Sequence, residues 1–174
     1  MYEMLQILEE IEKQMSRILI GIIDETIPIK TLYIDYHKPF VKRIWFSVAD
    51  YRVYLHLIEA MDRNVPTQAL FHPHPWPSAM RIIKGEYLMG VGNSKTDDAP
   101  EPDCTLIIPA GTCYEMTNHD GWHYVYPTVD TYTIMVTGPP TGRKMPIEPQ
   151  KTFRELTPDE VEDILSVVLN YYAK

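Results

Sequence analysis

The sequence predicts a mainly β, single-domain protein in which antiparallel strands form a sandwich or barrel, with a helix at each end. Between residues 31 and 137, short segments rich in Ile, Val, Tyr, Phe and Trp alternate with turn residues. Short strands at such regular spacing are typical of sandwiches and barrels. A chain of 174 residues, 45% of them apolar, is long enough to bury one sizeable core.

A series of short strands is expected in this central region. Turn signals such as Ala49-Asp50, Gly85 and Pro109-Ala110-Gly111 separate segments of β-branched and aromatic residues. The expected strands are Thr31–Tyr36, Lys42–Val48, Tyr51–Glu59, Phe71–Pro77, Ala79–Lys84, Glu86–Val91, Thr105–Ile108, Thr112–Thr117, Trp122–Tyr126 and Thr131–Thr137.

The two ends of the chain show helical periodicity. Apolar residues recur at three- and four-residue steps from about Tyr2 to about Ile22, which predicts one amphipathic helix. Near the other end, Thr157-Pro158-Asp159-Glu160 forms a capping box with proline at the first helical position. Apolar residues at helical spacing follow it as far as Tyr172, so a second helix is expected there.

These elements predict three parts within one domain. Residues 1–27 hold the N-terminal helix, residues 28–140 the β region, and residues 141–174 a Pro-rich connector followed by the C-terminal helix. The sequence contains no P-loop, GxGxxG or GxSxG motif, so nucleotide-binding and serine-hydrolase chemistry have no local support.

The charge and the cysteines restrict the partners and the compartment. The net charge of −8 argues against binding to nucleic acid or to an anionic membrane. No apolar stretch reaches the length of a membrane span, and the first residues are acidic rather than typical of a signal peptide. Cys104 and Cys113 are expected to be reduced and buried, so we predict a cytoplasmic protein.

The most informative stretch is Phe71–Pro77, which places two histidines between prolines. In an extended strand, residues i and i+2 point to the same face, so His72 and His74 would reach into one place. Proline removes backbone donors and fixes φ, which makes the segment stiff and non-helical. Two neutral imidazoles on a rigid strand provide half of a transition-metal site.

These residues resemble the motifs of the cupins, a family of small antiparallel jelly-roll barrels. The His72-Pro73-His74 triplet and the later Gly85 match the spacing of the first cupin motif. Pro109-Ala110-Gly111, followed by Asn118, approaches the second motif. The resemblance covers about residues 68–138 and implies a cupin-type jelly-roll barrel with a divalent metal bound inside it.

The sequence departs from the cupin pattern at two ligand positions. Ser78, or Ala79 with the longer spacing, stands where the family has a glutamate ligand, and Tyr114 stands where it has the third histidine. Glycines of the two motifs are replaced by Pro66 and Asp103. Aligned in this way, the chain would keep two histidines and a phenol.

A better third ligand is found in Gly121-Trp122-His123-Tyr124-Val125, which resembles the third-histidine segment of cysteine-dioxygenase-like cupins. Those enzymes use three histidines and no carboxylate, which implies a site of His72, His74 and His123. His119 and Tyr114 are the alternatives for the third ligand, and Tyr114 is also the candidate catalytic side chain. However, Met135 and Thr137 replace that family's catalytic histidine and tyrosine.

The expected function is therefore a metal-binding cupin, with iron(II)-dependent dioxygenation of a small molecule as the leading activity. Nickel, zinc or manganese are the alternative metals. The competing hypotheses are a binding or sensor protein without catalysis and a structural barrel with a degenerate site. A homodimer is expected from the resemblance. An inward ring of apolar side chains would receive the small molecule, and it consists of Trp76, Met80, Met89, Tyr114, Met116, Trp122, Tyr132 and Met135.

Overall fold

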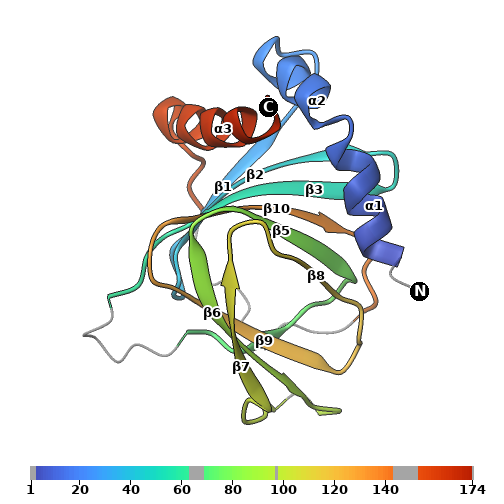
Figure 1. Ribbon diagram of the computed structural model, residues 1–174, viewed down its shortest axis with the longest axis vertical. Coiled ribbons are helices and arrows are strands. Elements are labelled where there is room, and N and C mark those ends of the chain that lie inside the picture. The colour runs from blue at the N-terminus through green and yellow to red at the C-terminus, as the bar shows by residue number, and fades with distance from the viewer. Residues whose placement is uncertain (1–2, 63–68, 97, 143–152, 174) are drawn as a thin grey trace.

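Two antiparallel sheets and three helices make up the protein (Figure 1). A computed structural model describes residues 3–62, 69–96, 98–142 and 153–173. The predicted Pro-rich connector lies largely outside these residues. Within the described chain, none of the helices is both long and apolar enough to cross a bilayer.

The larger sheet has six strands in the order β1-β2-β3-β10-β5-β8, and the smaller has four in the order β4-β9-β6-β7. The strands of the larger sheet are β1 Lys30–Ile34, β2 Val41–Val48, β3 Tyr51–Ile58, β5 Ser78–Lys84, β8 Cys113–Met116 and β10 Thr131–Thr137. Those of the smaller sheet are β4 His72–Pro73, β6 Glu86–Asn93, β7 Cys104–Pro109 and β9 Gly121–Pro127.

The predicted fold class is confirmed, since the chain is mainly antiparallel β with flanking helices. Every strand pair in the two described sheets is antiparallel. The sheets are compatible with a jelly roll, but hydrogen bonding does not join them into a closed barrel among the described residues. Gly85, with φ of +87°, makes the turn that takes the chain from β5 in one sheet to β6 in the other.

The histidine-bearing strand is shorter than predicted. Only His72 and Pro73 form a strand, whereas the sequence predicts one over Phe71–Pro77. Proline cannot donate a ladder hydrogen bond, so the prolines at 75 and 77 prevent the pairing from continuing.

The N-terminal segment forms two helices where one is predicted. α1 (Glu3–Glu12) and α2 (Met15–Ile23) are separated at Lys13-Gln14. The two helices have different packing partners: Glu12 of α1 pairs with Arg81 of β5, whereas Ser16 of α2 donates to a backbone oxygen of the C-terminal helix. Apolar periodicity runs through the break, which is why the sequence pattern does not reveal it.

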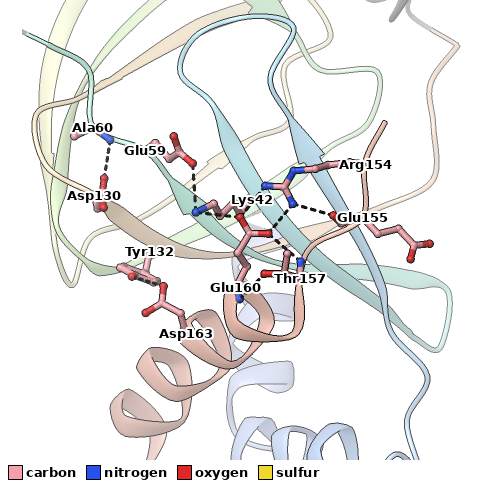
Figure 2. Close-up of polar contacts among 10 residues, drawn as sticks. All are labelled: Lys42, Glu59, Ala60, Asp130, Tyr132, Arg154, Glu155, Thr157, Glu160 and Asp163. Carbon is pink, nitrogen blue, oxygen red and sulfur yellow. Dashed lines mark hydrogen bonds and ion pairs between the residues drawn. The ribbon is translucent and has the colours of Figure 1, made fainter. Parts of the chain in front are cut away.

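The C-terminal helix α3 (Pro158–Tyr172) begins at the predicted capping box. The Thr157 hydroxyl accepts from the Glu160 backbone N–H at 3.3 Å, and the Glu160 carboxylate accepts from the Thr157 N–H at 2.9 Å. Figure 2 shows that the same carboxylate lies between Arg154 and Lys42, at 2.7 and 3.4 Å. These contacts attach the start of α3 to the strand β2.

The larger sheet separates two apolar cores. Its outer face packs under the three helices (Figure 1). Its inner face packs against the smaller sheet through a second cluster that includes Met80, Tyr87 and Met135. The space between the two sheets is where the candidate site lies. Cys104 is exposed because β7 is an edge strand, so the expectation that this thiol is buried is wrong.

Candidate metal centre

Three histidines from two strands of the smaller sheet lie together on its inner side. His72 of β4 and His123 of β9 are direct partners in the antiparallel pairing, which brings residues 51 positions apart into contact. His74 follows β4 and returns to the same place, as the i, i+2 spacing predicts. One potential ligand nitrogen from each ring lies within 4.8 Å of the other two.

His74 and His123 present their Nε2 atoms to each other beside His72. The Nε2 atoms of His74 and His123 are 2.8 Å apart. His72 Nδ1 donates to the Leu70 carbonyl at 2.9 Å, and His74 Nδ1 lies 3.3 Å from the Ser78 hydroxyl. These contacts use Nδ1, while the Nε2 atoms of His74 and His123 share a hydrogen bond that a bound ion would replace. Such contacts at the outer nitrogen hold metal-binding histidines in orientation. The Nδ1 of His123 is buried without a hydrogen-bond partner among the described residues.

The rings are also kept in the form that binds metal. Burial lowers the pKa of His72 to about 4 and that of His74 to about 3. Burial and the two neighbouring histidines lower the pKa of His123 well below its usual value. All three are therefore neutral near pH 7, and a neutral imidazole is the state that coordinates a metal ion.

The spacing of His74 and His123 suits two ligands of one divalent ion. Two nitrogens that are each about 2.1 Å from one ion and at a right angle to each other are about 3 Å apart. The 2.8 Å between the Nε2 atoms of His74 and His123 is close to this value. Three imidazoles without a carboxylate leave the full charge of the ion uncompensated and leave coordination positions open.

The cluster opens into a cavity of about 410 Å³ between the two sheets. A volume of this size accommodates a small organic molecule. Much of the wall is apolar, formed by Ile34, Val41, Ile58, Leu70, Val125 and Met135. The described residues that line the cavity include two basic side chains, Lys38 and Arg43, but no aspartate or glutamate.

The predicted metal ligands are thus brought together, and the alternatives are placed elsewhere. His119 is exposed in the turn before β9 and is not part of the cluster. Tyr114 does not line the cavity. Its hydroxyl lies 2.7 Å from the Tyr87 hydroxyl and donates to Met80 Sδ at 3.2 Å, while burial raises its pKa to about 12. A catalytic role for Tyr114 stays a prediction.

The expected apolar ring is only partly realised. Trp76, Met80 and Met135 line the cavity. Tyr132 instead packs on the helix side of β10, where its hydroxyl donates to Asp163 at 2.8 Å (Figure 2). Tyr132 and Met135 are three positions apart, so a strand with a period of two places them on opposite faces.

The sequence prediction missed the basic and histidine side chains on the opposite wall. His37, Arg43 and His56 all line the cavity. His56 is 3% exposed and contacts Arg43 rather than the metal cluster, which agrees with a structural role. The sequence did contain a signal for Arg43. It lies two positions from the apolar Val41 and Trp45 on β2, so the three side chains share one face of the strand.

Several solved structures resemble the chain. Ectoine synthase from P. lautus is 18% identical, with a TM-score of 0.44 and 75% of each chain covered. An RmlC-like cupin from Shewanella frigidimarina is 14% identical, with a TM-score of 0.44, 68% of this chain and 88% of that chain covered. The iron(II) form of HppE is 15% identical, with a TM-score of 0.47, 65% of this chain and 56% of that chain covered.

One of these three structures is a cupin. No protein-family model and no curated protein sequence matches the chain. The function is accordingly argued from the site itself.

Proposed function

We propose that this chain is a metalloprotein that holds a divalent transition metal, iron(II) foremost, on His72, His74 and His123. The observation that carries this proposal is the convergence of three neutral rings, two of them with Nε2 atoms 2.8 Å apart. His123 is buried and His72 and His74 are half-buried, and three imidazoles held in contact lose part of their hydration, which costs free energy. A bound cation would repay this cost.

We further propose that the site is an enzyme centre, an iron(II)-dependent dioxygenase that acts on a small molecule. Iron(II) held by three imidazoles supplies charge and open positions for oxygen and substrate. The chain's own residues provide the rest of the site. The Leu70 carbonyl and the Ser78 hydroxyl orient His72 and His74. The apolar walls of the 410 Å³ cavity exclude water and hold the substrate beside the cluster.

A second candidate is a binding protein that holds a small molecule beside the metal without turnover. One observation favours it: the described cavity wall contains no carboxylate, and the Tyr114 hydroxyl is engaged with Tyr87 and Met80. Among the described lining residues, general acid–base chemistry would therefore depend on histidine, Tyr36 or Lys38 rather than on a carboxylate.

Metal content tests the first proposal. The protein would be purified without a metal-affinity tag, reloaded with iron(II), and analysed by mass spectrometry beside two variants. We expect near-stoichiometric metal in the native protein, a loss in His123→Ala and retention in His119→Ala. The second variant is a matched control, because His119 is an exposed histidine from the turn that precedes β9. Metal retained by His123→Ala, or absent from the native protein after reloading, would contradict the proposed site.

Oxygen consumption by the iron-loaded protein with small-molecule panels separates the enzyme from the binding protein. Turnover that disappears in His123→Ala supports the dioxygenase, whereas ligand binding without oxygen uptake supports the second candidate. The homodimer, the cytoplasmic location and the three-part division of the chain stay predictions.

A further inference from the structure

A polar row crosses the inner face of the larger sheet opposite the histidine cluster. Arg43 of β2 is the direct partner of His56 of β3, which in turn is the partner of Thr133 of β10. Arg43 Nε donates to His56 Nε2 at 3.0 Å, and His56 Nδ1 lies 3.1 Å from the Thr133 hydroxyl. Because His56 Nε2 accepts, its ring proton is on Nδ1 and the imidazole is neutral. The row therefore supplies no negative charge to balance Arg43.

Arg43 differs in this respect from two other arginines of the protein. Arg81 pairs with Glu12, and Arg154 pairs with Glu160. Among the described residues, no carboxylate lies within ion-pair distance of Arg43. Its partners are instead the neutral His56 and the Tyr54 ring, with the guanidinium carbon 4.9 Å from the ring centroid. A cation on a cavity wall without a counter-charge is costly unless a ligand provides one.

The position of Arg43 also indicates which part of the guanidinium is available. One donor, Nε, is used by His56, and a face of the group lies over the Tyr54 ring. The terminal nitrogens form an edge that suits a planar acceptor, and the guanidinium fork matches a carboxylate with two parallel hydrogen bonds. Lys38 lines the same cavity and adds a second positive charge, in a chain whose net charge is −8.

We propose that Arg43 binds the carboxylate of a small, otherwise apolar molecule that occupies the cavity and extends toward the three histidines. Arg43 belongs to the larger sheet and the histidines to the smaller one, and both line the same 410 Å³ space. The apolar side chains that share these walls, Ile58, Val125 and Met135, suit a hydrocarbon body. The second half of this proposal, the direction toward the histidines, rests on the proposed function, whereas carboxylate binding by Arg43 does not.

Calorimetric titration with benzoate and benzamide tests this carboxylate site in the metal-free protein. The two probes share a shape but differ in charge, so their comparison isolates the contribution of the carboxylate. We expect benzoate to bind at least about tenfold more tightly than benzamide, because hydrogen bonds between charged groups are the stronger ones. The Arg43→Gln variant should bind both probes equally weakly.

Arg52→Gln is the matched control. Arg52 is also an arginine of the larger sheet stacked on an aromatic ring, 5.0 Å from the Trp45 centroid, but it is exposed and does not line the cavity. The Arg52→Gln variant should bind benzoate as tightly as the native protein does. If Arg43→Gln does not fold, Arg43→Lys replaces it, and this variant should keep the charge but lose most of the preference for benzoate over benzamide.

Equal binding of the two probes by the native protein, or benzoate binding that Arg43→Gln or Arg43→Lys leaves unchanged, would overturn the proposal. Inorganic phosphate that binds more tightly than benzoate would overturn the choice of a carboxylate. The experiment is separate from the metal test. Loss of the metal hypothesis would leave the benzoate result standing, and failure of benzoate to bind would leave the metal result standing.

Discussion

The two faces of the larger sheet carry alternate residues of the same strands, yet their chemistry is opposite. On the helix side, Leu55 and Ile134 are completely buried in an apolar core. One residue along on each of these strands, His56 and Thr133 belong to the polar row that ends at Arg43, and His56 and Arg43 line the cavity. The comparison teaches that one face stabilises the fold, while the other gives up apolar packing to hold groups that can bind a ligand.

Removing a large side chain from the helix-side core should have the largest effect on stability. Leu55→Ala should lower the free energy of unfolding by about 2–5 kcal/mol, because it leaves a cavity in a packed core. Urea denaturation would measure this loss, and the folded variant should still bind metal. Leu106→Ala is the control, since Leu106 is 45% exposed and should change stability by about 0.5 kcal/mol or less. A similar loss in both variants would contradict the comparison.

As the pH falls, protonation of the cavity-side histidines should be the first change to lower the free energy of unfolding. The pKa values of His72 and His74 are lowered to about 4 and about 3 by burial, from 6.5. Between the unfolded-state pKa of 6.5 and these lowered values, the unfolded chain binds more protons than the folded one. The stability of the metal-free protein therefore falls as the pH drops from about 6.5 toward 4. Denaturation at a series of pH values would show this slope, and His74→Gln should flatten it.

The helix side provides a contrasting pH window. Hydrogen bonds from Arg154 lower the pKa of Glu160 to about 2, from 4.5. This pairing contributes above pH 4.5 and is lost as the pH falls toward 2, with a magnitude reduced by solvent screening. Glu160→Gln should therefore leave the slope between pH 6.5 and 4.5 unchanged. A slope that responds to Glu160→Gln and not to His74→Gln would contradict the assignment of the two windows.

Replacing the cation on the cavity side should have the smallest effect on stability. Arg43→Met removes a charge whose described partners are neutral, so the free energy of unfolding should fall by no more than about 1 kcal/mol and can rise. Thermal and urea unfolding, beside Arg52→Met, would measure it. A loss as large as that of Leu55→Ala would mean that Arg43 supports the fold rather than a ligand.

Local patterns in the sequence predicted much of the fold and part of the site. The capping box at Thr157 and Glu160 appears as predicted, because it depends on residues three positions apart. The placement of the His72 and His74 side chains on the same face of the chain also follows from their i, i+2 spacing. The third proposed ligand, His123, was predicted from a family resemblance, because no neighbouring residue along the chain identifies its partners.

Other features had no local signal. The break between α1 and α2 occurs within an unbroken apolar period, and only the different packing partners of the two helices account for it. The strand at His72, by contrast, had a local signal. Its prolines limit the ladder to the pairs His72–His123 and Pro73–Trp122, and the predicted strand was too long because it did not take them into account.

The sequence by itself therefore determined most of the strands, the capped C-terminal helix and the shared direction of His72 and His74, because these depend on periodicity and neighbouring residues. Only the tertiary structure decided that His123 completes the cluster and that Arg43 faces it across a cavity without a described counter-charge. The physical reason is that strand register and sheet packing join residues distant along the chain, and these alignments are fixed by the burial of whole faces.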